Sequence, residues 1–231
     1  MSDPHAKLAR EKVAIVGVGG TGSHILDFVC KTPVQFIGLF DGDEYDERTP
    51  LRSPGPLAPG GAKHKVERHA NRYRGLQRGQ EVRPYPVFID EENADQLGDF
   101  DTVFVCIGSG RVKRRVVEVC LEDPNHLLID VGMAVHRTGS SVLGGLVRVT
   151  TLLPSRQDHV KRIGLDAPAT DPKDRNHQTV ELNALNAALA VIKWKKVRGV
   201  FSDSKDELHS LYNIEGNGLS SRYASGGLAR C

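Results

Sequence analysis

Residues 12–23 read KVAIVGVGGTGS, and this stretch decides the fold. Its first part is a short run rich in valine and isoleucine, which is typical of a parallel strand buried on both faces. The run stops at the glycine-rich sequence 17–22, which matches the pattern GxGxxG, and a helical apolar pattern follows over 23–31. A strand, a glycine-rich turn and a helix in this order predict the first unit of a nucleotide-binding α/β fold.

The glycine-rich turn 17–22 has the composition of an anion-binding site. Glycines permit a tight turn and let backbone N–H groups approach a phosphate closely, and the first turn of a helix supplies the positive end of its dipole. A second strand is expected over 34–40 and ends at Asp41, where a carboxylate can accept hydrogen bonds from ribose hydroxyls. The expected phosphate-binding residues are Gly17, Gly19, Gly20 and Gly22.

Two carboxylates follow the second strand, because Asp43 lies two residues beyond Asp41. Both are candidate nucleotide-binding residues, but carboxylates so near a phosphate repel it, and a cation is needed to compensate. Arg52 lies within the proline- and glycine-rich segment 51–62 and Lys65 lies just after it, and either could clamp a triphosphate where charge builds up during adenylyl transfer. Taken alone, each has a competing interpretation as an ordinary solvated surface cation.

The rest of the chain continues the alternation of strand and helix. Residues 142–153 indicate one more strand, either parallel or antiparallel, and 178–197 give the clearest long helix. We therefore predict an α/β fold, with a Rossmann-like, doubly wound, mostly parallel sheet and helices on both faces. Further strands are expected over 82–88, 102–107 and 127–131, and further helices over 63–73 and 112–121.

The chain is expected to form one nucleotide-binding domain over 1–231, with the glycine loop and the acidic strand end in 12–66. Residues 154–176 are polar and contain prolines, so they predict a long crossing loop. After residue 213 the sequence is small and polar, which predicts a flexible tail.

Composition argues against several classes of protein. Hydrophobic residues make up 39% and charged residues 26% of the chain, and a net charge of +2 gives no one-sided basic surface for nucleic acid. No run approaches the roughly 18 apolar residues of a membrane span, and the start MSDPHAKLAREK is too polar for a signal peptide. We expect a cytoplasmic protein that contacts neither nucleic acid nor membrane.

The cysteines are scattered and form no Cys-x-x-Cys pair, so neither a zinc tetrathiolate nor a disulfide framework is indicated. Cys30 and Cys106 fall within a predicted helix and a predicted strand, where core packing is the better explanation. Cys231 lies on the predicted tail with nothing nearby in sequence to lower the pKa of its thiol. The cysteines are Cys30, Cys106, Cys120 and Cys231.

Seven runs of the sequence can be compared with known families. They are VAIVGVGGTGS (13–23), LFDGDEYDERTPLRSPG (39–55), KHKVE (63–67), FIDEEN (88–93), FVCIGSG (104–110), LLIDVGMAV (127–135) and QTVELNALNAALAVIKWKK (178–196). In this order they resemble the ThiF/MoeB/HesA family, which includes the ubiquitin-activating enzymes. The resemblance spans most of 12–199, and is greatest to the bacterial ThiF-type domains of ubiquitin-like conjugation operons.

This resemblance implies an ATP-dependent adenylyltransferase. The C-terminal carboxylate of a ubiquitin-like or sulfur-carrier protein would attack the α-phosphate of ATP, with Mg²⁺ assisting, to give an acyl-adenylate and pyrophosphate. By the same resemblance the glycines hold the phosphates, Asp41 holds the ribose, and Arg52 and Lys65 act catalytically by neutralising the phosphates. A homodimer is also implied.

The sequence departs from the family pattern at three places. Gly108 stands where the family has a magnesium-binding aspartate, and Thr49 replaces an asparagine. The loop 154–176 contains no cysteine, so it offers no nucleophile for a thioester. No metal ligands are assigned, and Asp130 is either part of a metal or nucleotide site or a capping carboxylate.

Two other functions compete with the adenylyltransferase. One is a scaffold that keeps the nucleotide fold, has lost the chemistry and binds a ubiquitin-like partner, as Gly108 and the cysteine-free loop would allow. The other is a NAD-dependent oxidoreductase, because the same glycine pattern serves that cofactor. Gly20 and the Asp-Gly-Asp sequence 41–43 favour the adenylyltransferase over the oxidoreductase, for which no substrate domain with a general acid stands out.

Overall fold

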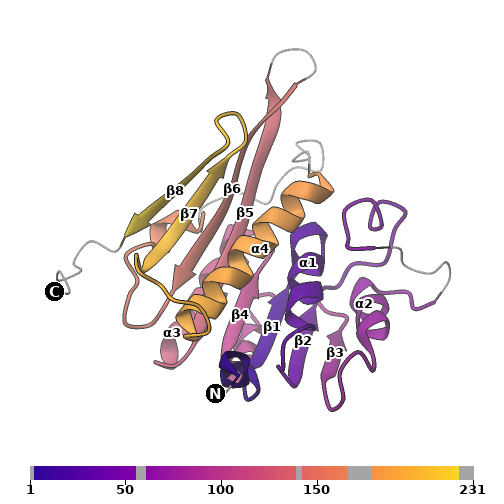
Figure 1. Ribbon diagram of the computed structural model, residues 1–231. Coiled ribbons are helices and arrows are strands. Elements are labelled where there is room, and N and C mark those ends of the chain that lie inside the picture. The colour runs from indigo at the N-terminus through magenta and orange to yellow at the C-terminus, as the bar shows by residue number, and fades with distance from the viewer. Residues whose placement is uncertain (1–2, 56–60, 139–141, 166–177, 224–231) are drawn as a thin grey trace.

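The computed structural model describes residues 3–55, 61–138, 142–165 and 178–223. Its strands form one sheet in the order β3-β2-β1-β4-β5-β6-β7-β8 (Figure 1). The neighbours from β3 to β5 pair in parallel, and those from β5 to β8 pair antiparallel. The strands are β1 (Lys12–Val16), β2 (Phe36–Phe40), β3 (Glu81–Tyr85), β4 (Thr102–Val105), β5 (Leu127–Thr138), β6 (Val142–Leu152), β7 (Glu207–Asn213) and β8 (Gly218–Tyr223).

Helices cover both faces of this sheet. One apolar cluster joins the sheet to α1, α2 and α4, and a second joins the opposite face to α3 and the 3-10 helix η2. Figure 1 shows α1 and α4 side by side on the near face. The predicted doubly wound α/β class is therefore confirmed. The helices are η1 (Pro4–Leu8), α1 (Gly20–Val29), α2 (Lys65–Tyr73), η2 (Ala94–Asp99), α3 (Gly110–Glu122), η3 (Val160–Arg162) and α4 (Val180–Val197).

The glycine loop passes directly into α1, which begins at Gly20 rather than at the predicted residue 23. The Ser23 N–H already donates to the Gly19 carbonyl at 3.0 Å, so the end of the motif is the first turn of the helix. Apolar periodicity could not show this start, because the first turn is made of small residues. The other predicted elements of the parallel half agree with the structure to within a few residues.

The largest difference concerns β5, which runs for twelve residues although 127–131 alone reads as a buried strand. The distal half of β5 pairs with β6 in an antiparallel ladder that extends from Leu128 and Leu152 to Thr138 and Val142. Gly145 lets the two strands pass closely, since a Cβ there would lie 2.0 Å from the Ala134 carbonyl oxygen. The strand predicted over 142–153 is thus antiparallel.

The predicted flexible tail after residue 213 is wrong for residues 218–223, which form β8 and pair with β7. Asn217 turns the chain between the two strands with a positive φ of 45°. A short polar edge strand is held by its ladder of backbone hydrogen bonds, so no apolar pattern predicts it.

The predicted crossing loop is described as far as residue 165 and contains η3, while residues 166–177 lie outside the described part. Among the described helices, none is both long and apolar enough to cross a membrane.

Candidate nucleotide site

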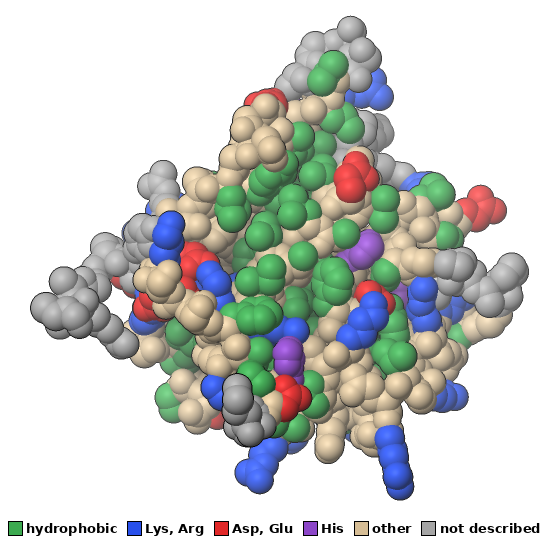
Figure 2. Space-filling model, viewed as in Figure 1, with side chains coloured by type: hydrophobic (Ala, Val, Ile, Leu, Met, Phe, Trp, Pro, Cys, Tyr) green, Lys and Arg blue, Asp and Glu red, His purple; other side chains and the backbone are tan. Residues whose placement is uncertain are grey.

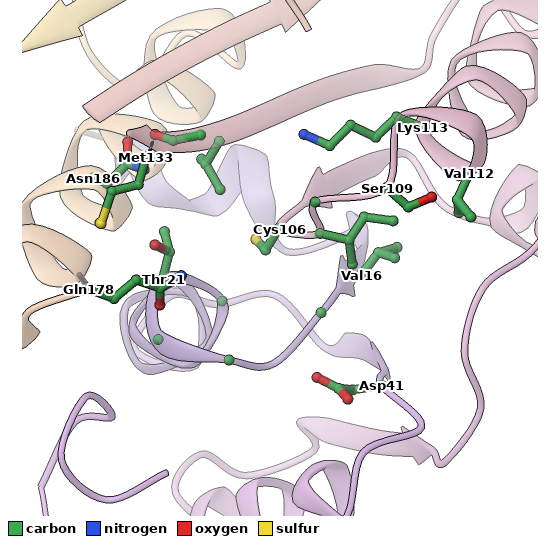
Figure 3. Close-up of a pocket in the computed structure, with 18 of the residues that line it drawn as sticks. Val16, Thr21, Asp41, Cys106, Ser109, Val112, Lys113, Met133, Gln178 and Asn186 are labelled. Atoms are coloured by element: carbon green, nitrogen blue, oxygen red, sulfur yellow. Dashed lines mark hydrogen bonds between the residues drawn. The ribbon is translucent and has the colours of Figure 1, made fainter. Parts of the chain in front are cut away.

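The glycine loop and the ends of the parallel strands surround a cavity of about 750 Å³ (Figure 3). This volume is in the range of small-molecule binding sites, and the carboxyl end of a parallel sheet is where such folds bind ligands. The structure brings every predicted site residue to this one cavity. They are Gly17, Gly19, Gly20, Gly22, Asp41, Asp43, Arg52 and Lys65.

The four glycines of the loop have different surroundings. Gly17 has a φ of 88°, which favours glycine, and a Cβ on Gly22 would lie 1.9 Å from the Gly17 carbonyl oxygen. A Cβ on Gly20 would lie 2.3 Å from the side-chain nitrogen of Asn183. Gly19 alone has no described atom within 4 Å of its Cβ position. The open space at Gly19 therefore lets a ligand approach the backbone there.

Asp41 holds the glycine loop in place. Its carboxylate accepts from the Val18 N–H at 2.8 Å and from the Asp43 N–H at 2.9 Å. The side chain is 8% exposed, and burial raises its pKa, while the bond from Asp43, the charge of Lys65 and the bond from Val18 oppose the rise. A carboxylate oxygen has room for a further donor, so Asp41 can still accept from a ribose hydroxyl.

The two predicted cations differ in their partners. Lys65 is 6% exposed, and its Nζ lies 2.5 Å from Oδ2 of Asp43. Arg52 is half-buried, and its Nε is buried without a hydrogen-bond partner among the described residues. Asp43 thus neutralises Lys65, whereas Arg52 lines the cavity with a buried Nε–H that has no partner among the described residues.

Helix α4 contributes two asparagines that the sequence did not single out. Oδ1 of Asn183 accepts from the Thr21 hydroxyl at 2.8 Å, which ties α4 to the glycine loop. Nδ2 of Asn186 donates to the Gly132 carbonyl on β5 at 3.0 Å, and Asn186 lines the cavity. Both are fully buried. The signal in the sequence was two asparagines three residues apart in the otherwise apolar stretch 182–192 of this helix.

A second group that the sequence missed surrounds Asp130. This fully buried carboxylate lies 2.5 Å from Nζ of Lys113 and 2.6 Å from Nη2 of Arg148. Burial raises the pKa of Asp130, and the two cations oppose that rise. Asp130 is the last residue of β5 that pairs with β4, and it lies within the strand rather than at its end. It is therefore neither a cap nor a free metal ligand.

A magnesium ion does not fit the described residues of this cavity. Mg²⁺ is usually held by one or two carboxylates together with substrate phosphates. Asp41 accepts two backbone N–H groups, Asp43 pairs with Lys65, and Asp130 pairs with two cations. Gly108 lines the cavity without offering a ligand. Among the residues that the structure describes, no three His, Cys, Asp or Glu side chains form a metal cluster.

Thr49 does not take the place of the family's asparagine at the cavity. Its hydroxyl donates to Oδ1 of Asp46 at 2.8 Å and its N–H donates to the same oxygen at 2.9 Å. The side chain is 2% exposed, so it stabilises the turn after β2.

The described cysteines are poor nucleophiles, as core packing predicts. Burial raises the pKa of Cys30 and of Cys120 to about 12. Cys106 lines the cavity, but burial and the charge of Asp130 raise its pKa further, with Lys113 opposing. Cys231 lies outside the described residues.

Comparison with solved structures supports the same fold. PaaA is 15% identical with a TM-score of 0.72, and the match covers 96% of this chain and 66% of PaaA. MccB from E. coli, solved with ATP, is 17% identical with a TM-score of 0.72, over 96% of this chain and 66% of MccB. MccB solved with AMPCPP and MccA is 18% identical with a TM-score of 0.72, over 98% of this chain and 67% of MccB.

The chain thus spans about two thirds of the length of these solved proteins. At such identities the likeness shows the fold and leaves substrate and activity to the site itself. No curated protein sequence matches this chain. The model of the ThiF family matches residues 2–193, which include the glycine loop, every predicted site residue and most of α4. The chain belongs to the ThiF family.

Proposed function

We propose that this protein binds ATP and uses it to adenylate a carboxylate. One observation carries the proposal: the glycine loop, Asp41, Arg52 and Lys65 line a single cavity at the carboxyl end of the parallel strands. Membership of the ThiF family and the similarity to MccB, which was solved with ATP, support the same nucleotide.

Each residue has a part in this reaction. The first N–H groups of α1 bind phosphate oxygens, and the carboxylate of Asp41 accepts from the ribose. An oxygen of the substrate carboxylate attacks the α-phosphorus, the bond from that phosphorus to the bridging oxygen breaks, and pyrophosphate leaves. The guanidinium of Arg52, which lines the cavity, stabilises the developing charge, and Lys65, held by Asp43, donates to a phosphate oxygen. The protein contributes position and charge rather than a covalent intermediate.

The proposed substrate is the C-terminal carboxylate of a ubiquitin-like or sulfur-carrier protein. The cavity continues from the glycine loop along β5 and β6, where small and apolar residues line it beside Arg148. Such a lining suits an extended peptide tail that reaches the nucleotide. MccB was solved with MccA, which is consistent with a peptide or protein substrate in this fold. The lining residues here are Gly132, Met133, Ala134 and Leu146.

We also propose that the protein is a homodimer. Between residues 182 and 192, helix α4 has apolar side chains on its outer side as well as on its buried side apart from Asn183 and Asn186, and Val180 and Ile192 are 42% and 43% exposed. Hydrophobic side chains gather over α4 and the neighbouring part of β5 and β6 (Figure 2). A stretch of helix that is apolar on its outer side as well is normally covered there too.

Exchange of labelled pyrophosphate into ATP tests the adenylation. With the matching ubiquitin-like or sulfur-carrier protein from a purified panel, we expect sustained exchange that depends on its free carboxyl terminus. Arg52→Ala and Lys65→Ala should each lower the exchange rate about tenfold or more, as expected for a lost charged hydrogen bond, with little change in thermal midpoint. Lys63→Ala is the matched control, because Lys63 is exposed and pairs with Glu44 at the surface.

A nucleotide-binding scaffold is the second candidate, and the glycine at position 108 favours it. Tight ATP binding without exchange for any member of the panel would support the scaffold and refute the adenylyltransferase. Tighter binding of NAD than of ATP would refute both and favour an oxidoreductase. Equal loss of folding in Arg52→Ala and Lys65→Ala would contradict the roles assigned to those two residues.

A further inference from the structure

The group formed by Lys113, Asp130 and Arg148 has two positive side chains and one carboxylate, so it carries a surplus of positive charge. Asp130 is fully buried, Lys113 is 5% exposed and Arg148 is half-buried. Buried charges are costly unless they are paired, and here one carboxylate must pair with both cations. The group therefore carries positive charge that its own carboxylate does not neutralise.

Both cations of the group line the cavity, while the carboxylate lies behind them. Figure 3 shows Lys113 and Asp41 on opposite sides of the glycine loop. A nucleotide whose ribose is held by Asp41 and whose phosphates cross the glycine loop would direct those phosphates toward Lys113. The positive group therefore stands where negative charge of the nucleotide accumulates.

The same region fails to offer a carboxylate for a metal ion, because Gly108 stands in the segment between β4 and α3 and the described acids are engaged. A lysine and an arginine fixed by Asp130 supply positive charge at this place without any metal ligand. Their geometry is set by the fold, so no reorganisation is needed when the anion enters.

We propose that Lys113 and Arg148, positioned by Asp130, bind the nucleotide phosphates and take over the charge-neutralising role that the family gives to a carboxylate-held metal. This inference rests on the proposed function, since it requires a nucleotide in the cavity. Lys113 and Arg148 are then two further phosphate-binding residues, and nucleotide binding is independent of divalent cations.

Calorimetric titration with the non-hydrolysable analogue AMP-PNP tests this, in EDTA and in excess MgCl₂. We expect the natural protein to bind with similar affinity in both buffers. Lys113→Met should weaken binding in EDTA about tenfold or more, the typical effect of losing a charged hydrogen bond. Lys113→Arg keeps the charge and should retain most of the affinity. Lys31→Met is the control, because Lys31 is exposed and pairs with Asp27 away from the cavity.

Asp130→Asn separates binding from a merely structural role. Asparagine has the size of aspartate, and its Oδ1 can still accept from one of the cations, so both cations stay near their places. The opposing negative charge is removed, so binding should be at least as tight as in the natural protein. A structural role predicts instead that Asp130→Asn and Lys113→Met weaken binding alike. Should Asp130→Asn not fold, as judged by circular dichroism, the contrast between Lys113→Met and Lys113→Arg still decides the question.

Gly108→Asp tests whether nucleotide binding can be made to depend on Mg²⁺, because it restores the carboxylate that the family has at this position. This variant should bind AMP-PNP poorly in EDTA and regain affinity with MgCl₂. The inference is overturned if the natural protein loses affinity in EDTA and Lys113→Met binds normally. No binding by the folded protein in either buffer would refute the nucleotide site itself, and with it the proposed function, so the two failures are distinguishable.

Discussion

Gly17, Gly20 and Gly22 lack side chains because protein atoms fill the space that a Cβ would need, whereas Gly19 faces open cavity. The pattern GxGxxG therefore combines residues that shape the loop with one residue that admits a ligand. Asp41 likewise has two roles, since it fixes the N–H groups of Val18 and Asp43 and still faces the cavity. The sequence predicted the binding roles of these residues and missed their structural ones, which depend on contacts distant in the chain.

His69 on α2 is expected to make stability depend on pH. It is fully buried, neither ring nitrogen has a hydrogen-bond partner among the described residues, and burial lowers its pKa from 6.5 to about 4, helped by Arg72 and Lys65. The unfolded chain therefore binds the proton at a higher pH than the folded chain. The contribution of His69 to stability is complete above pH 6.5 and is lost as the pH falls toward 4.

Urea unfolding at pH 7 and pH 5 measures this effect. From the two pKa values we expect about 2 kcal/mol less free energy of unfolding at pH 5 from His69 alone. His69→Leu should remove that part of the pH dependence, since a leucine does not titrate. An identical loss of stability between the two pH values in the variant and the natural protein would show that other groups are responsible.

At the scale of elements, α4 positions the glycine loop through the bond between Asn183 and Thr21. We expect Asn183→Ala to weaken AMP-PNP binding, because the start of α1 loses its anchor and its amides are less well aligned. The free energy of unfolding should fall by about 1–2 kcal/mol, the usual cost of removing a partner from a buried polar group. Titration calorimetry and urea unfolding measure the two effects.

Thr21→Val and the double variant form the control for this prediction. Both single changes remove the same hydrogen bond, so the double variant should bind little worse than Asn183→Ala. Additive losses of affinity would contradict an anchoring role for this pair.

The strands of the C-terminal half show that a local sequence pattern does not predict the length of a strand. Residues 127–131 read as a complete buried strand, yet β5 continues to Thr138 because β6 pairs with it along its whole length. The hairpin of β7 and β8 extends the sheet by backbone ladders with few apolar residues. Strand length here is decided by pairing partners, and those are not local in sequence.

At the scale of the whole molecule, the outer side of α4 should be the dimer interface. Ile192→Glu places a charge on that side and should convert a dimer into a monomer, because an unpaired charge is costly to bury between two subunits. Sedimentation equilibrium measures the mass directly. Leu76→Glu is the control, since Leu76 is 51% exposed in the turn after α2 and should leave the dimer intact.

A monomeric natural protein at micromolar concentration would contradict this interface. A dimer in which both variants remain dimeric would place the contact elsewhere on the surface.

The sequence by itself determined the α/β class, the glycine loop and the candidates Asp41, Asp43, Arg52 and Lys65. A buried parallel strand reads as a continuous apolar run, and a phosphate-binding turn needs glycines in adjacent positions, so both signals are local. The structure confirms the class and places these side chains around one cavity.

Only the tertiary structure decided which cationic side chains pair with a carboxylate and which side chains surround Asp130. Lys113, Asp130 and Arg148 come from α3, β5 and β6 and meet because β5 lies between β4 and β6 in the sheet. Asn183 reaches the loop because α4 packs beside α1. Such contacts join residues far apart in the chain, and the physical reason they escape the sequence is that burial and pairing depend on the neighbours that folding supplies.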